Sequence, residues 1–271
     1  MSDGVEVGQS DAMASRARTS SFSTQRSAAL YAGRGRRTKT VANASPSKKQ
    51  MTVVNWENVL APMDWMAVYL GLGTTNAAIE AAVVRCRSSS DLLQSFATIE
   101  ERIMELLTET MRVVGGPVFI VSEYTTAYVE LVSSLFFPRL TAALRSATSG
   151  VYVVGTPNTQ LTALEMKQWK VNLLHTAVLE HLFAGVDEAV ATNLLARSAH
   201  GRIKVVALCA NESDTAAASA IRLIAPNAIV KHIRVAGPKI GFTHSPQAPL
   251  SLDEFYAQLQ RLIQFVRQNA N

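Results

Sequence analysis

The chain has 271 residues, of which 48% are apolar and 17% charged, so it can bury one sizeable hydrophobic core. The longest apolar stretch, residues 131–144, contains Pro138 and Arg139, and the sequence therefore predicts no membrane-spanning helix. Cys86 and Cys209 belong to no CxxC or Cys/His motif, which argues against a disulfide framework or a zinc site. We expect both to be buried free thiols.

Charge divides the chain into two parts. Residues 1–12 carry three acids, whereas residues 13–50 carry six Arg, three Lys and no acid, which gives +9. The remaining residues carry 17 basic and 18 acidic side chains, a net charge of −1. The sequence therefore predicts a basic N-terminal arm, residues 1–50, and one nearly neutral folded domain, residues 51–271.

The arm has too little apolar mass to offset chain entropy, so we expect it to be disordered in isolation. Arg and Ser without acids are typical of a mitochondrial targeting segment, which favours the mitochondrial matrix. Alternatively, Arg34, Arg36 and Arg37 belong to a flexible, glycine-containing cationic tract at residues 33–37 that could contact RNA phosphates. A plain solvated tail is the third interpretation.

Five apolar runs rich in β-branched residues predict the strands of the folded part. They span residues 65–70, 118–121, 151–154, 203–208 and 228–235. Runs without polar alternation indicate strands that are buried on both faces, with helices between them as covers. The fold class predicted is α/β, a doubly wound, mostly parallel five-stranded sheet of the flavodoxin or Rossmann type.

Helix signals lie between these runs. Thr98 with Glu101 predicts a helix start, and Gly115 with Gly116 predicts its end. Segment 211–214 starts a helix that stops at Pro226, and Ser251 with Glu254 starts the amphipathic C-terminal helix. Residues 159–200 hold no strand signal, which predicts an inserted helical hairpin broken near Ala184.

Two loops and four acidic residues are candidates for a binding edge. Gly71–Asn76 either approaches an anion at a helix start or is a packing turn, and its incomplete glycine fingerprint favours packing. Gly155–Thr159 is either a ligand-binding loop at the carboxyl end of a strand or a helix-capping turn, and the capping turn is favoured. Acidic residues follow two other predicted strands and could face the same edge, although carboxylates at helix starts usually interact with the helix dipole. They are Glu123, Glu130, Glu212 and Asp214.

No sequence motif assembles a catalytic group. The five histidines form no HExxH motif, no GxSxG precedes a helix, and no cofactor fingerprint is complete. The sequence therefore predicts a binding or scaffold protein with no catalytic residue, metal or cofactor.

Basic side chains near the predicted loops would form an RNA-phosphate surface if they converge, and ordinary solvated surface is the alternative for each. Besides Arg34, Arg36 and Arg37 of the arm, the candidates are Lys167, Lys170, Arg202, Lys204, Lys231, Arg234 and Lys239.

The order of several segments carries a family resemblance. VYLGLG at 68–73 precedes an Arg-containing stretch at 87–98, then IEERIMELLTETMRVVGG at 99–116 and PVFIV at 117–121. KVVALCANES at 204–213 follows later, ahead of an Ala-rich helix. This order resembles the ribosomal small-subunit protein S-two family over roughly residues 56–241, with the helical stretch at 161–197 where that family inserts a hairpin.

The resemblance implies a noncatalytic structural constituent of the mitochondrial ribosome small subunit, a diverged member that contacts rRNA and neighbouring ribosomal proteins and no membrane. The chief alternative is a phosphosugar-binding or isomerase protein of the sugar-isomerase-domain type, which the loops at 155–163 and 213–215 also resemble. In that alternative the phosphate loop would follow residue 121, where this chain places Glu123. The carboxylate would repel a phosphate.

Overall fold

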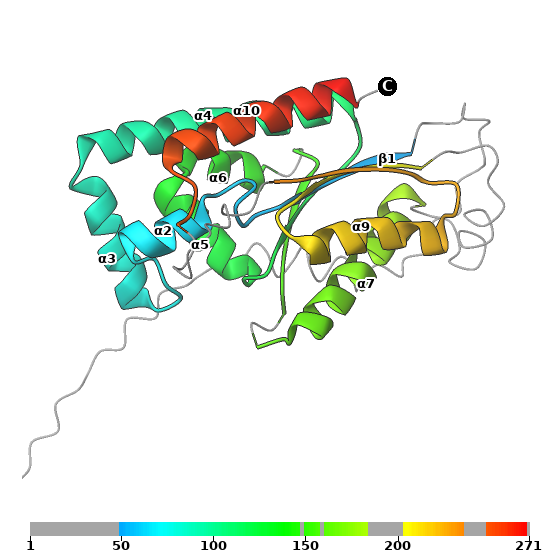
Figure 1. The fold of residues 1–271 in the computed structure, drawn as a ribbon, viewed down its shortest axis with the longest axis horizontal. Coiled ribbons are helices and arrows are strands. Elements are labelled where there is room, and N and C mark those ends of the chain that lie inside the picture. The colour runs from blue at the N-terminus through cyan, green and yellow to red at the C-terminus, as the bar shows by residue number, and fades with distance from the viewer. Residues whose placement is uncertain (1–48, 147–148, 158–159, 184–202, 236–247, 270–271) are drawn as a thin grey trace, which may run out of the picture. The chain divides into compact units, whose positions relative to one another are not determined.

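The computed structural model describes residues 49–146, 149–157, 160–183, 203–235 and 248–269 (Figure 1). Its sheet consists of β1 (Gln50–Asn55), β2 (Val118–Ser122), β3 (Val151–Gly155), β4 (Lys204–Cys209) and β5 (Ile229–Arg234). All pairings are parallel, in the order β3-β2-β1-β4-β5. The predicted doubly wound α/β class is thus confirmed. Within the described segments, no helix combines the length and the apolar character needed to cross a membrane.

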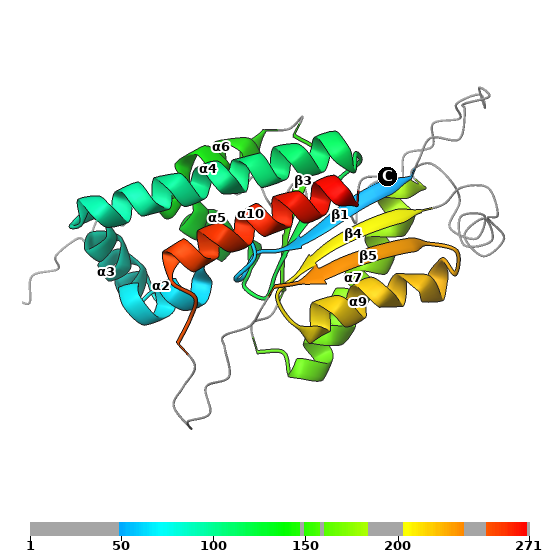
Figure 2. The same cartoon turned by 45° about the horizontal axis from the view of Figure 1, so that its top comes forward.

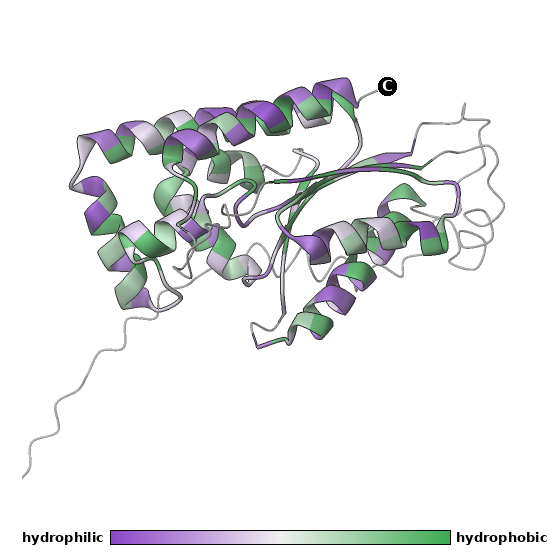
Figure 3. Cartoon of the chain, in the orientation of Figure 1, coloured by the Kyte–Doolittle hydropathy of each residue, from purple (hydrophilic) through white to green (hydrophobic). Residues whose placement is uncertain are grey.

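The helices lie in two layers, one on each face of the sheet (Figure 2). They are α2 (Met63–Leu70), α3 (Asn76–Arg87), α4 (Ser90–Val113), α5 (Thr126–Phe136), α6 (Pro138–Arg145), α7 (Ala163–Leu182), α9 (Glu212–Ile224) and α10 (Leu252–Gln268). α7 and α9 cover one face and the others pack on the opposite face, where α10 lies beside α4. Figure 3 shows hydrophobic and hydrophilic bands alternating along α10. Because helices cover both faces of the sheet, β1 buries Val54 on one face and Met51 with Val53 on the other.

The first strand is not where the sequence predicts it. Residues 65–70 belong to helix α2, which buries Met63, Met66 and Leu70 and exposes Val68 and Tyr69. This spacing follows the helical period, and a short apolar run does not by itself distinguish a helix from a strand. The true first strand, β1, starts where the predicted arm ends. The other four strands overlap the predicted runs.

The predicted start of α4 is also wrong. The helix begins at Ser90, where the hydroxyl of Ser89 accepts from the Leu92 amide, and Thr98 lies inside the helix with its hydroxyl donating to the Gln94 carbonyl. The predicted end is confirmed, because α4 stops at Val113 ahead of two glycines with positive φ.

Both later helix starts are confirmed. α9 and α10 each begin with a reciprocal capping box, in which the N-cap side chain and the third helical residue satisfy each other's backbone N–H groups. α7 begins with the same device at Thr162. Of the predicted hairpin at 159–200, α7 is the helix described, and the predicted second helix lies outside the described residues. Residues 1–48 of the predicted arm, 1–50, also lie outside them, and its last residue, Gln50, begins β1. Cys86 and Cys209 are buried free thiols, as expected.

Two adjacent glycines give a matched test of the packing of β1. Gly115 and Gly116 both have positive φ, but a Cβ on Gly116 would lie 1.9 Å from the Gln50 carbonyl oxygen, whereas one on Gly115 would meet nothing within 4 Å. Gly115→Ala is expected to cost about 1 kcal/mol of left-handed strain. Gly116→Ala is expected to cost about 1–3 kcal/mol more, because β1 must move. Urea unfolding measures the difference, and equal losses would contradict the close approach of Gly116 to β1.

Candidate functional site

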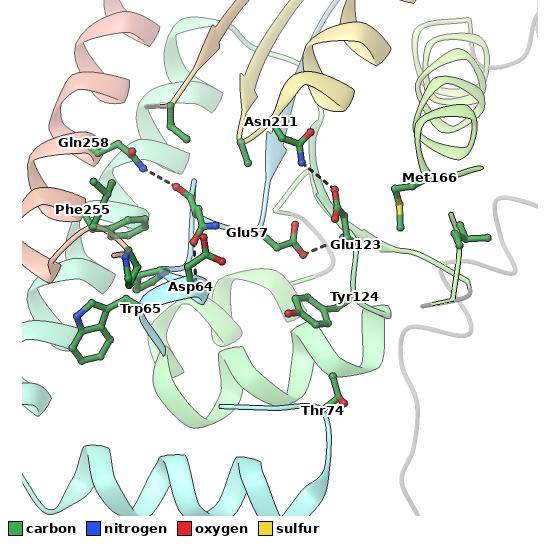
Figure 4. Close-up of a pocket in the computed structure, with 17 residues that line it drawn as sticks. Glu57, Asp64, Trp65, Thr74, Glu123, Tyr124, Met166, Asn211, Phe255 and Gln258 are labelled. Atoms are coloured by element: carbon green, nitrogen blue, oxygen red, sulfur yellow. Dashed lines mark hydrogen bonds between the residues drawn. The ribbon is translucent and has the colours of Figure 1, made fainter. Parts of the chain in front are cut away.

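A cleft of about 730 Å³ lies at the carboxyl ends of the strands (Figure 4). The crossovers from β1 and from β3 run to opposite faces of the sheet, so β1 and β4 flank the point where the winding reverses. Open α/β sheets usually bind ligands outside the strand ends at this point. The lining residues are Glu57, Asn58, Pro62, Asp64, Trp65, Thr74, Glu123, Tyr124, Leu161, Met166, Ala210, Asn211, Val235, Pro249, Leu250, Phe255 and Gln258.

Glu57 lies in the turn that follows β1, directly after the fully buried Trp56. Its Oε1 atom accepts from the Ser122 hydroxyl at 2.5 Å and from the Glu123 amide at 3.0 Å. Its Oε2 atom is buried and has no hydrogen-bond partner among the described residues. Burial outweighs the Ser122 hydrogen bond and raises the pKa of Glu57 to about 7.

Asn58 connects this turn to two helices. Its side-chain Oδ1 accepts from the Asp64 amide at 3.1 Å, in the first turn of α2, and its carbonyl accepts from Gln258 Nε2 of α10 at 2.7 Å. The Oε1 atom of Gln258 is buried without a hydrogen-bond partner in the described part of the chain. The Asp64 side chain is exposed. The acidic side of the cleft is therefore held by the turn after β1 and by α10.

Lys170 of α7 lies behind the opposite wall, with only 2% of its side chain exposed. Its Nζ atom lies 2.6 Å from Glu123 Oε1, 2.5 Å from Asp214 Oδ1 and 3.1 Å from Ser213 Oγ. Burial lowers the pKa of Lys170, but the two carboxylates more than offset this and the net shift is upward. Burial likewise raises the pKa of Glu123, and the Lys170 ammonium turns the net shift downward.

Side-chain amides complete this cluster. Asn55 Nδ2 of β1 donates to Asp214 Oδ2 at 2.8 Å, and Asn211 Nδ2 donates to Glu123 Oε1 at 3.1 Å. The backbone amides of Ala210 and Asn211 also donate to Asp214 Oδ2. The Lys170 cluster, defined as Lys170, Glu123, Asp214, Asn55 and Asn211, thus joins the ends of β1, β2 and β4 to α7 and α9.

The described residues of the two glycine-containing loops make contacts within the fold. Gly71, with φ 65°, ends α2 rather than a strand, and the Gly73 carbonyl accepts from the Tyr128 hydroxyl at 3.1 Å. Thr75 then caps α3 with its own side chain. Gly155 donates to Thr126 Oγ1 at 2.9 Å. Residues 158–159 of the second loop lie outside the described residues.

The basic residues proposed for an RNA surface are only partly brought together. Lys231 and Arg234 lie on the edge strand β5, half-buried and exposed respectively, and Lys167 is exposed on α7. Lys170 and Lys204 are buried at 2% and 7% exposure, so their ammonium groups are not displayed where a phosphate would contact them. Arg34, Arg36, Arg37, Arg202 and Lys239 lie outside the described residues.

The acidic residues divide in a similar way. Glu123 and Asp214 meet at one edge, as the sequence suggested, because both follow the carboxyl ends of parallel strands. Glu130 and Glu212 do not line the cleft. Glu57, Asp64 and Gln258 were not singled out from the sequence. An acid two residues after a buried β-branched strand would have indicated Glu57 as a candidate. This pattern is not recognised because β1 itself is not predicted.

Comparisons of this chain with protein-family models, with curated proteins and with solved structures found no match. Among the described residues, no group of His, Cys, Asp and Glu could hold a metal ion. The cleft is therefore interpreted from its own chemistry.

Proposed function

We propose that this chain is a noncatalytic structural constituent of the mitochondrial ribosome small subunit, which binds rRNA and neighbouring ribosomal proteins. The observation that carries the proposal is the acidic cleft at the strand ends. A phosphate-binding enzyme of this fold class would present backbone N–H groups or basic side chains there. This chain presents Glu57, Asp64 and Glu123.

At two helix starts near this edge, capping side chains accept from backbone N–H groups that could otherwise bind an anion. The Asp214 amide of α9 donates to Asn211 Oδ1, and the Tyr128 amide of α5 donates to Thr125 Oγ1. Capping side chains thus occupy donors that a phosphate would need. Together with the carboxylates of Glu57 and Asp64, which have no cationic partner among the described residues, this disfavours the phosphosugar-binding alternative.

Outer surfaces support docking in an assembly. β5 is an edge strand that carries Lys231 and Arg234, and Arg222 of α9 donates to the Val230 carbonyl of the same strand at 3.4 Å. This basic edge, defined as Arg222, Lys231 and Arg234, suits the phosphates of an RNA backbone. On α2 and α3, Val68 and Val84 are 63% and 67% exposed, which suits contact with a protein neighbour.

The test is sedimentation of the full chain from lysed mitochondria. The protein is expected to travel with the small ribosomal subunit at low salt and to leave it at high salt, because salt screens phosphate contacts. Replacing Lys231 and Arg234 with glutamate should lower the salt concentration at which it leaves. The matched control is Arg261→Glu, an exposed arginine on α10 away from β5.

Two results would contradict the proposal. One is migration as a free protein that binds a phosphosugar. The other is sedimentation with the subunit that is equally sensitive to the β5 variant and to the α10 control.

A further inference from the structure

The acidic side chains of the cleft are only partly compensated by cations in the described residues. Among the described residues that line it are three carboxylates, from Glu57, Asp64 and Glu123, and no lysine, arginine or histidine. Carboxylates grouped around a concave surface strengthen each other's field and disfavour ionisation of the buried member. A group of acids is therefore stabilised when a cation enters.

Two buried acceptors in the same cleft have no donor among the described residues. Glu57 Oε2 and Gln258 Oε1 are both buried without a hydrogen-bond partner, and Gln258 is only 3% exposed. Leaving a buried acceptor unsatisfied costs about 1–3 kcal/mol. The other ends of both side chains are fixed, by Ser122 and the Glu123 amide for Glu57 and by the Asn58 carbonyl for Gln258. These oxygens are thus held in place for a donor from outside.

Lys170 does not donate to either of these two buried oxygens. Its Nζ atom is within 3.1 Å of Glu123, Asp214 and Ser213, so its donors are engaged by groups other than Glu57 and Gln258. Only Glu123, of the three acids in the cleft, has a cationic partner in the described residues. Glu57 and Asp64 remain without one.

Apolar and aromatic side chains form part of the remaining walls, next to the polar Asn58, Thr74 and Asn211. Trp65, Tyr124 and Phe255 line the cleft with Leu161, Met166 and Leu250, and Figure 4 shows Trp65, Asp64 and Phe255 grouped on the side of Glu57 and Gln258. Aromatic faces attract cations and also cover the methylene stem that carries them. A volume of about 730 Å³ is within the range of cavities that hold organic ligands.

We propose that this cleft binds a ligand that presents a primary ammonium or guanidinium group on an apolar stem, with the cation at Glu57 and Asp64. The donors of the cation satisfy Glu57 Oε2 and Gln258 Oε1, and the stem lies against Trp65 and Phe255. Such a group comes either from a basic side chain of a protein segment or from a polyamine. This binding does not depend on the ribosomal proposal, because it rests on the cleft alone.

The experiment is calorimetric titration of the full chain at low ionic strength with two cationic probes. One probe is spermidine and the other is a blocked peptide, acetyl-Gly-Arg-Gly-amide, with acetyl-Gly-Gln-Gly-amide as its neutral counterpart. At least one cationic probe is expected to bind saturably and the neutral peptide is not. Binding of spermidine alone identifies a polyamine as the source, and binding of the peptide alone identifies a protein segment; either supports the proposal.

Variants locate the binding. Glu57→Gln is expected to weaken it about tenfold or more, because a charge-assisted hydrogen bond becomes neutral. Asp64→Asn should weaken it less, since Asp64 is exposed and screened. The matched control is Asp253→Asn, another exposed aspartate in the first turn of a helix, which does not line the cleft and should leave binding unchanged.

The proposal is overturned if neither cationic probe saturates, or if Asp253→Asn weakens binding as much as Glu57→Gln does. The second outcome would mean that the probes bind the general negative surface. Circular dichroism confirms that each variant is folded before titration. A negative result leaves the sedimentation test untouched, so the two proposals fail separately.

Discussion

Replacing Lys170 with methionine is expected to lower the free energy of unfolding by about 3–5 kcal/mol, the typical cost of breaking a buried ion pair from one side. The substitution leaves Glu123 and Asp214 facing each other without the ammonium that now lies within 2.6 Å of both. Methionine fills much of the same space, so the loss arises from uncompensated charge rather than from a cavity.

Denaturant unfolding followed by circular dichroism measures the effect. The control is Lys167→Met, an exposed lysine one turn earlier on α7, which should change stability by less than about 0.5 kcal/mol. A second variant separates charge from packing. Glu123→Gln is expected to be destabilising in the wild-type chain but much less so when Lys170 is already methionine. Equal losses from Lys167→Met and Lys170→Met would contradict the role of the cluster.

The sequence predicts the sheet well where strands are continuous apolar runs. β2 and β4 are such runs, and β3 is recognised by VYVVG between glycines. β1 is not predicted, because its sequence, QMTVVN, mixes polar residues into a strand that is buried from Met51 onward. Thr52 and Asn55 are both buried there, at 0% and 2% exposure. Burial of these polar groups depends on the neighbouring strands and on Asp214, which no local pattern contains.

The site is predictable only in part, for the same reason. That Glu123 and Asp214 share an edge follows from parallel strands ending on one side. That Lys170 pairs with both does not, because a fully buried lysine is rare and its partners lie 47 and 44 residues away. Gln258 is more distant still, 200 residues from the Asn58 carbonyl that orients it. Long-range side-chain contacts of this kind become visible only with the fold.

Glu57 makes stability depend on pH in a direction opposite to that of an ion-paired acid. Its pKa is about 7 in the folded chain against a usual value of 4.5, because it is buried. Between these two values the folded state holds a proton that the unfolded state has lost, so stability falls as pH rises through this window. The full contribution is present below about pH 4.5 and is lost above about pH 7, and it amounts to about 3 kcal/mol.

Glu57→Gln should remove this fall in stability with rising pH. The glutamine Oε1 can still accept from Ser122 and the Glu123 amide, and its Nε2 takes the place of the buried Oε2 without a charge. The free energy of unfolding of the variant, relative to that of the wild type, is therefore expected to rise from pH 4.5 to pH 7 by up to about 3 kcal/mol, and to rise no further above that range. Urea unfolding at half-unit pH steps measures the difference, which cancels the titration of other groups. The matched control is Glu212→Gln, which removes a carboxylate from the exposed surface rather than from beside β1. A constant offset between Glu57→Gln and the wild type across this pH range would show that the Glu57 carboxyl titrates alike in the folded and unfolded chains, and that the interior beside β1 admits water to it.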